Sequence, residues 1–296
     1  MKKVLVIGGT TFDSIVYLDK LPSPEPQTIH YAPFNETIGS TGAGKALNLT
    51  KLGVENTLHS IIGKDIFGEK IVKNLEDAGV TFIYDIDPNG TERHINLMDE
   101  NGGRISIFIT QSSSELELNM DKIEKEIKEC DLIVLNIIGY TKQLIPLIKK
   151  YKKPVWTDLH DYNVGNPYHE DFIEMADSIF VSSDNMKDYR PTMEKWIEQG
   201  KELVVCTHGK EGSTALTKEG QWIETSIIKD YKFKDANGAG DSFFSGFLSY
   251  YLKGKPIDEC LKAGTICAGL CITSNELVFE GLSEEFLNRE FEKYYM

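Results

Sequence analysis

The stretch Asp235-Ala236-Asn237-Gly238-Ala239-Gly240-Asp241 stands directly before an apolar run with helical spacing at residues 242–248. The first N–H groups of a helix have no intrahelical acceptor and lie at the positive end of its dipole, so they bind anions. Small residues such as Gly238 and Gly240 let the backbone approach a phosphate closely. Asp241 is placed to accept a proton from a hydroxyl beside that phosphate, which indicates phosphoryl transfer to an alcohol.

A turn at Gly238 and Gly240 with a helix cap at Asp241 would equally explain a bare Gly-x-Gly-Asp, because short motifs arise often by chance. The longer stretch, however, resembles the Asp-Thr-Thr-Gly-Ala-Gly-Asp signature of the ribokinase-like (PfkB) carbohydrate kinases and departs from it only at the two Thr positions. The resemblance implies that Asp241 is the catalytic base. It also implies that the amides of Gly238, Ala239 and Gly240 hold the transferred phosphate.

Length and composition indicate one globular domain spanning residues 1–296. The chain is 41% apolar and 26% charged, and no apolar run approaches the roughly 20 residues that a membrane helix needs. A net charge of −14 disfavours nucleic acid as a partner, because such binding relies on Lys and Arg at phosphates. The odd number of cysteines, five, without a Cys-x-x-Cys pair fits a reducing compartment, so we expect a cytoplasmic protein without membrane or nucleic-acid partners.

Short apolar runs alternate with amphipathic segments along the chain. This pattern favours an α/β fold with a doubly wound, mostly parallel central sheet that helices cover on both faces. The strands are expected at residues 3–9, 58–62, 131–136, 155–157, 178–181 and 203–207, and helices at 43–52 and 67–78.

Two inserted segments, about 14–38 and 91–110, break this alternation. Residues 28–34 alternate like a strand, and a turn at 101–103 separates two further strand-like runs. Together they predict a small antiparallel sheet that closes as a lid over a substrate, although an ordinary surface hairpin has the same pattern. In the family that the chain resembles, such lids often pair, which implies a homodimer through the lid.

A second glycine-rich stretch, residues 39–46, imitates a P-loop. Gly39, Gly44 and Lys45 have the Walker A spacing, but Ala46 stands where Ser or Thr would place a hydroxyl on Mg²⁺. We therefore predict that Lys45 is not a phosphate-binding P-loop lysine.

The same stretch resembles the N-terminal kinase signature that contacts the substrate alcohol and ends in Leu-Gly. Ser40 replaces the second Gly of that signature, and Gly44 replaces an Asn, which puts the usual sugar preference in doubt; Asn48, one turn on, offers a substitute amide. Asp13 resembles the Asp of the family's first-strand motif, which bonds two sugar hydroxyls, although it also fits a turn. The predicted substrate residues are Asp13, Thr11, Gly39, Ser40, Gly44 and Asn48.

The nucleotide side resembles the family's Thr-x-Gly-x-x-Gly after a core strand. Thr207 is expected to reach the ATP phosphates or ribose, Gly209 and Gly212 to allow the turn, and Asn237 to contact the nucleotide. Ala263 and Gly264 would leave room for the adenine, or simply pack against another helix.

The sequence contains only weak motifs for metal-binding residues. The family's Asn-x-x-Glu has no clear counterpart after residue 181, which leaves Asp184 and Asp235 as candidates for Mg²⁺ bound with ATP. Potassium activation stays open, because the C-terminal cation loop is not clear in the sequence. The six His residues lack metal spacing, although His94 is placed to face a substrate from the lid.

The resemblance therefore implies a kinase that moves the γ-phosphoryl group of ATP to a primary hydroxyl of a sugar. A nucleoside kinase is the alternative within the same fold, because ribose also presents a primary alcohol. A sugar- or nucleotide-sensing protein without activity is the alternative from another class.

Overall fold

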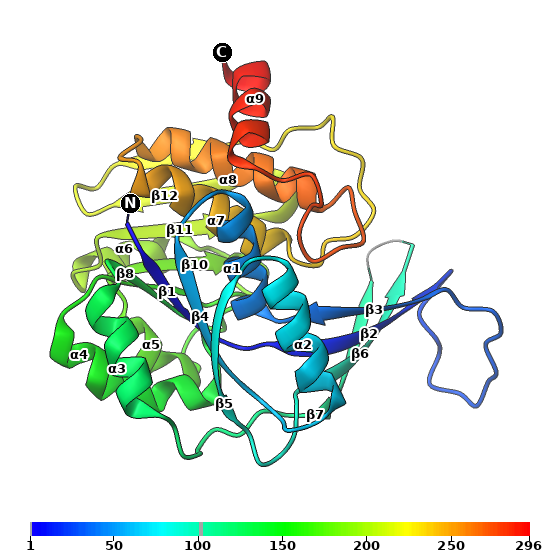
Figure 1. Cartoon of the computed structure of the whole chain (residues 1–296). Helices are drawn as coiled ribbons and strands as arrows, with labels where there is room; N and C mark the ends of the chain where they lie inside the picture. The colour runs from blue at the N-terminus through cyan, green and yellow to red at the C-terminus, as the bar shows by residue number, and fades with distance from the viewer. Residues whose placement is uncertain (1, 101–102) are drawn as a thin grey trace.

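The computed structural model describes residues 2–100 and 103–296, and its strands and helices alternate as the sequence predicts (Figure 1). Within these residues the central sheet has the strand order β13-β12-β11-β10-β9-β8-β1-β4-β5, and all neighbours from β11 to β5 are parallel. Only β12 and β13 run antiparallel at one edge. The strands are β1 (Val4–Ile7), β4 (Asn56–Ile62), β5 (Thr81–Ile86), β8 (Leu132–Leu135), β9 (Val155–Asp158), β10 (Ser178–Ser182), β11 (Leu203–Thr207), β12 (Ser213–Thr217) and β13 (Trp222–Thr225).

The central sheet separates two apolar cores, and strand β1 contributes to both of them. Val4 and Val6 belong to one core, whereas Leu5 and Ile7 belong to the other, because successive strand side chains point to opposite faces. All four are fully buried, which explains why the strand is a continuous apolar run rather than an alternating one.

Each core is closed by its own layer of helices. One layer contains α1 (Thr41–Lys51), α2 (Ile66–Asp77), α7 (Ala239–Leu252), α8 (Ile257–Cys271) and α9 (Glu284–Tyr295). The other contains α3 (Met120–Glu129), α4 (Ile145–Tyr151), α5 (Glu170–Met175) and α6 (Arg190–Glu198). The chain is therefore a three-layer α/β structure, and no helix in the described part is long and apolar enough to cross a bilayer.

A second, smaller sheet projects from one side of the central sheet (Figure 1). Its order is β3-β2-β6-β7, built from β2 (Thr11–Leu18), β3 (Phe34–Gly39), β6 (Arg93–Asp99) and β7 (Arg104–Thr110). The small sheet that we expected to be antiparallel has two antiparallel pairs, and a parallel pair between β2 and β6 joins them. A parallel pair is possible here because β2 and β6 lie far apart in the chain and are not joined by a hairpin, which would force them to run antiparallel.

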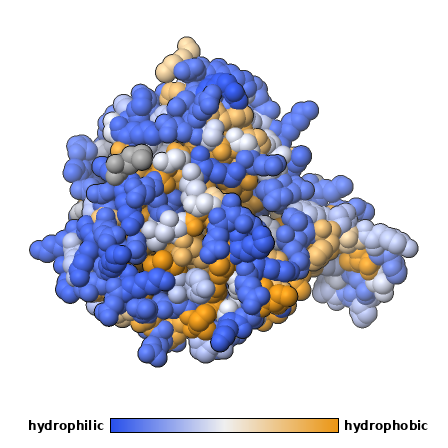
Figure 2. Space-filling model, in the orientation of Figure 1, coloured by the Kyte–Doolittle hydropathy of each residue, from blue (hydrophilic) through white to orange (hydrophobic). Residues whose placement is uncertain are grey.

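The strand expected at residues 28–34 begins only at Phe34, and the preceding residues form the loop that extends furthest from the body in Figure 1. Pro24, Pro26 and Pro33 lack the N–H that a strand ladder requires. The turn expected at 101–103 falls mostly on residues 101–102, which lie outside the described part. Figure 2 shows apolar surface on this projecting part of the molecule.

Candidate active site

Polar residues gather where parallel strands of the central sheet end. Asn136 follows β8 directly, and Asp158 is the last residue of β9. Gly8 and Gly9 follow β1, where the Gly9 carbonyl accepts a hydrogen bond of 3.1 Å from the Ala43 N–H at the start of α1. Ligands of open α/β sheets bind at this carboxyl edge, so the topology places a site here.

The stretch before α7 forms a tight turn, as the sequence predicts. Gly238 adopts a left-handed backbone (φ 78°), and α7 begins at Ala239. The Ala239 N–H donates a hydrogen bond of 3.2 Å to the Ala236 carbonyl, so this amide of the turn already has an acceptor within the protein. Asp241 lies in the first helical turn and is buried.

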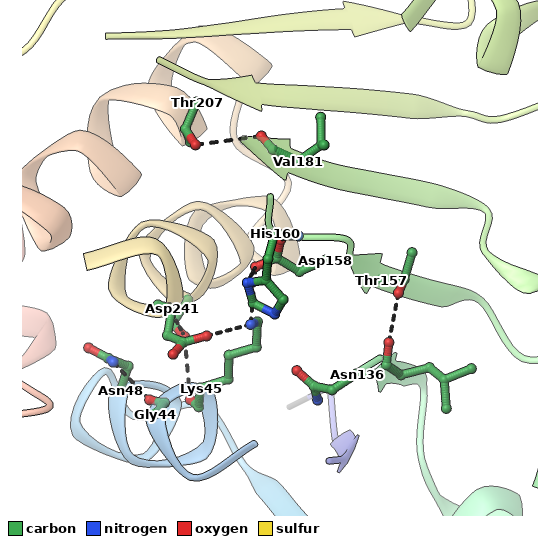
Figure 3. A network of polar contacts seen from close by, with 12 residues as sticks. Gly44, Lys45, Asn48, Asn136, Thr157, Asp158, His160, Val181, Thr207 and Asp241 are labelled. Atoms are coloured by element: carbon green, nitrogen blue, oxygen red, sulfur yellow. Dashed lines mark hydrogen bonds and ion pairs between the residues drawn. The ribbon is translucent and has the colours of Figure 1, made fainter. Parts of the chain in front are cut away.

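Asp241 has an unexpected partner. The Nζ of Lys45, from α1, lies 2.5 Å from Oδ1 of Asp241 and 3.1 Å from Oδ2 of Asp158 (Figure 3). The Lys45 side chain is fully buried. A helix from the start of the chain thus supplies a cation to the predicted catalytic carboxylate.

Lys45, Asp158 and Asp241 form a buried cluster of opposite charges. Burial lowers the pKa of Lys45, but attraction to Asp241 and then to Asp158 outweighs it, so the pKa of the ammonium lies above its usual range. Burial raises the pKa of Asp158, while the nearby charges of His160 and Lys45 bring it down to about 2. Lys45 and Asp158 are therefore an ion pair at neutral pH.

Gly44 gives the Asp241 carboxylate its place against α1. An ideal Cβ on Gly44 would lie 2.7 Å from Oδ2 and 3.1 Å from Cγ of Asp241. Asn48 lies one turn further along α1 and donates to the Gly44 carbonyl at 2.8 Å. The predicted substrate residues Gly44 and Asn48 thus lie in the turn of α1 that packs against Asp241. The Asn48 Oδ1 is buried without a hydrogen-bond partner among the described residues.

The lid contributes the other predicted substrate residues. We expected Asp13 at the end of the first strand, but β1 ends at Ile7 and Asp13 lies within lid strand β2. Thr11 pairs with Gly39 of β3, and a Cβ on Gly39 would lie 2.8 Å from the Asp13 Cγ, so glycine leaves room for this carboxylate. Ser40 follows with φ 73°, a conformation that suits the Gly it replaces.

Asp13 stands in a polar cluster of the lid. Its Oδ2 accepts a long hydrogen bond of 3.5 Å from Asn96 Nδ2, and its Oδ1 lies 3.6 Å from His94 Nδ1. His94 also contacts Glu92 at 2.9 Å. Burial raises the pKa of the Asp13 carboxyl.

Several buried polar atoms around this region lack a hydrogen-bond partner in the described chain. They are Thr11 Oγ1, Asp13 Oδ1, Asn136 Oδ1 and His160 Nε2. Buried polar groups are nearly always bonded in folded proteins, so these atoms are candidates for contact with a bound ligand or water.

The nucleotide-side residues form a tight turn after β11. Thr207 ends the strand, and its hydroxyl lies 3.5 Å from the Val181 carbonyl (Figure 3). Gly209 (φ 53°) and Gly212 (φ 105°) both take backbone conformations that favour glycine. Asn237 is half-buried beside the α7 turn, and its carbonyl accepts a bond from Cys271 Sγ at 3.3 Å.

Ala263 and Gly264 do not line open space in this structure. Ala263 is fully buried, and a Cβ on Gly264 would lie 2.8 Å from the Phe243 carbonyl of α7. Of the two interpretations of these residues, the structure supports helix packing, because small residues let α7 and α8 approach closely.

The two metal candidates differ sharply. Asp235 is buried; its Oδ1 accepts a bond from the Asn237 N–H at 2.8 Å, and its Oδ2 has no partner in the described residues. Asp184 is exposed. No three His, Cys, Asp or Glu residues in the described part are grouped to hold a metal ion.

Sequence reasoning missed Lys45, Asp158, Asn136 and His160. Asp158 and Asn136 carried a usable signal, because each is a polar residue at the point where a buried strand ends. Lys45 was considered only as a P-loop lysine. Residues 41–51 instead form α1 itself, which follows a lid strand, so the stretch is not a P-loop.

Comparison with known proteins identifies the family. The model of the pfkB family carbohydrate kinases matches residues 1–149 and 159–280, and the chain therefore belongs to this family. The match spans both the lid segments and the Asp235–Asp241 stretch.

Individual relatives agree over nearly the whole chain. The acarbose 7(IV)-phosphotransferase of an Actinoplanes species is 28% identical over 274 residues, covering 91% of this chain and 92% of the relative. The nucleoside kinase of Methanocaldococcus jannaschii is 27% identical over 288 residues, covering 92% and 91%. These relatives support a phosphotransferase with an alcohol acceptor, a sugar or nucleoside kinase of the ribokinase family.

Solved structures show the same fold. A microbiome-derived acarbose kinase has a TM-score of 0.88 at 27% identity, covering 97% of this chain and 98% of that one. Arabidopsis thaliana ribokinase, solved with ribose and ATP, has a TM-score of 0.81 at 20% identity and the same coverage. The small sheet beside the central sheet is part of this shared ribokinase fold.

Proposed function

We propose that this chain transfers the γ-phosphoryl group of ATP to a primary hydroxyl of a sugar, with Asp241 as the base. The observation that carries the proposal is a buried carboxylate in the first turn of α7, directly after the glycine turn at 238–240. Amides at this helix start stabilise charge on the transferring group, and Asp241 accepts the proton of the attacking hydroxyl.

The acceptor is proposed to lie between the lid and α1. Thr11, Asp13, Asn136 and His160 present buried polar atoms that lack partners in the described chain, and a ligand with several hydroxyls satisfies such atoms. An unmatched site of this kind strongly rejects analogues that lack the hydroxyls, which favours a sugar.

Magnesium fits the nucleotide side through Asp235. Mg²⁺ in kinase sites is usually held by one or two carboxylates together with the substrate phosphates, so the free Asp235 Oδ2 matches this use. Bound there, the ion would supply positive charge to the phosphates. Exposed Asp184 fits this role less well.

A nucleoside is the second candidate acceptor. The M. jannaschii relative is a nucleoside kinase, and the lid places Phe108 against His94 with ring centroids 3.9 Å apart. Phe108 is 57% exposed, so its ring offers a surface on which a base can stack.

A substrate screen by ADP release tests the proposal. We expect ADP release with at least one member of a sugar panel, less with matched nucleosides, and about 10²–10⁴ less with Asp241→Asn than with the wild type. Asp258→Asn, at the first turn of α8, is the matched control and should behave like the wild type. Absence of turnover with both panels, or full turnover by Asp241→Asn, would contradict the proposal.

A further inference from the structure

We propose that Lys45 is a positioning residue for Asp241: its ammonium holds the carboxylate in one orientation at the start of α7. The inference rests on the proposed function, because it takes Asp241 as the base of the transfer. It concerns a lysine that the glycine-rich stretch 39–46 had suggested for a different role.

The contacts of Lys45 are unusually complete for a lysine. Its fully buried Nζ lies 2.5 Å from Asp241 Oδ1, 3.1 Å from Asp158 Oδ2 and 5.0 Å from the centre of the Phe244 ring. Lysine is almost never fully buried unless it is paired. Burying an ion pair costs much of what its attraction returns, so stability alone is a weak reason for this arrangement.

Two neighbouring residues of α1 determine where the Asp241 carboxylate lies. The Lys45 ammonium bonds Oδ1, and Gly44, which has no side chain, leaves the room that Oδ2 occupies. Ser245, one turn beyond Asp241, donates to the Asp241 carbonyl at 2.8 Å and lies 3.3 Å from the Lys45 carbonyl. The two helices are thus fastened at the level of the carboxylate, and a carboxylate oxygen retains lone pairs for a substrate hydroxyl.

The electrostatic surroundings give the lysine a second effect. The charged or titratable groups near Asp241 are Lys45 from α1, Asp158 at the end of β9, His160 just beyond it, Asp235 before α7, and Cys271 from α8. Two of them are further carboxylates, and the incoming phosphates are also negative. Lys45 supplies positive charge within hydrogen-bond distance of the Asp241 carboxylate, which offsets part of the repulsion from these negative groups.

The test compares Lys45→Met with the double variant Lys45→Met/Asp158→Asn. Lys45→Met leaves two buried carboxylates without their lysine partner, and the double variant removes the charge of one of them, Asp158, which keeps the test usable if the single variant folds poorly. Lys201→Met is the matched control, because Lys201 is also buried but donates to the carbonyls of Glu174 and Ala176.

Both Lys45 variants should lower kcat by about tenfold or more while the acceptor KM changes only a few-fold, since a base held in the wrong orientation affects the chemical step. Lys201→Met should leave kcat and the acceptor KM near those of the wild type. A kcat that is unchanged in both Lys45 variants overturns the inference.

A measurement without substrate separates this inference from the proposed function. The ¹³C-carboxyl chemical shift of Asp241, assigned with Asp241→Asn and measured at neutral pH, should differ from the wild type in Lys45→Met and in the double variant, because the ammonium that bonds Oδ1 is gone. If the chemical shift is the same in all three proteins, the inference fails whether or not the enzyme turns over. If it differs while neither acceptor panel releases ADP, the Lys45–Asp241 interaction stands and the proposed function falls.

Discussion

The Nζ of Lys45 lies 2.5 Å from Oδ1 of Asp241, although 196 positions separate the two residues in the chain. The contact joins α1, which follows lid strand β3, to α7, which follows the predicted phosphate-binding turn. The proposed acceptor side and the proposed nucleotide side of the site therefore meet at one ion pair. Substitutions on the two sides should have separable effects.

Asp241→Asn should reduce turnover by about 10²–10⁴, because the Asn amide cannot take the proton of the attacking hydroxyl. Nucleotide affinity should be largely retained, since the amides of the 238–240 turn are unchanged. Steady-state ADP release and a nucleotide titration measure the two quantities. Turnover near that of the wild type would remove Asp241 from the mechanism.

Lys45→Met should leave the ATP dissociation constant within a few-fold of the wild type. The reason is that the Lys45 ammonium is already held by Asp241 and Asp158 inside the protein, and α1 has no P-loop geometry. Calorimetric titration with ATP checks this. A loss of affinity of about tenfold, roughly 1.4 kcal/mol, would show that the lysine contacts phosphate after all.

Asp13→Ala should weaken acceptor binding strongly while ATP binding stays nearly unchanged. Charge-assisted hydrogen bonds to the acceptor would be lost, each worth about 1.5–3 kcal/mol. In the wild type, acceptor affinity should fall as the pH drops, and begin to fall earlier than for an exposed carboxylate, because burial raises the pKa of Asp13. Equal loss of both ligands, or none, would make Asp13 a structural residue.

Asp158→Asn should destabilise the fold at neutral pH by about 2 kcal/mol, because the pKa of Asp158 is lowered from 3.8 to about 2. A lowered folded-state pKa gives stability that is present above about pH 4 and is lost as the pH falls toward 2. The difference in unfolding free energy between variant and wild type should therefore shrink over that interval. Urea unfolding at pH 7 and at a series of acid pH values measures it; a constant difference would contradict the assignment.

We propose that the outer face of the lid pairs with a second copy of the chain. Ile105, Ile107 and Ile109 are exposed on edge strand β7, on the face opposite Phe108. Ile107→Lys should shift a dimer to monomer in light-scattering chromatography. Ile66→Lys, at a more exposed isoleucine on α2, should not; a monomeric wild type would rule the dimer out.

The sequence was sufficient where the information is local. Buried parallel strands read as continuous apolar runs, and the turn at Gly238 required the glycine that marked it. The resemblance to a known kinase family is confirmed by the match of the family model to residues 1–149 and 159–280.

Long-range contacts could not be predicted in the same way. Nothing around Lys45 reveals that Asp158 and Asp241, on two other elements, meet its ammonium. The pairing of β2 with β6 likewise depends on two insertions coming together in space. For Ala263 and Gly264, room for a flat base and close helix packing require the same small residues, so the sequence alone did not separate the two interpretations.

Because the central sheet separates two cores, amino-acid substitutions in the two helical layers should have different consequences for activity. Asp241 and Lys45 are carried by α7 and α1, which close only one of the two cores. Substitutions in the layer of α3 to α6 should therefore shorten the lifetime of the folded protein and leave the chemistry of each surviving molecule intact. Mutations on the α3–α6 side of the sheet can therefore change the amount of folded protein without changing the activity of each folded molecule.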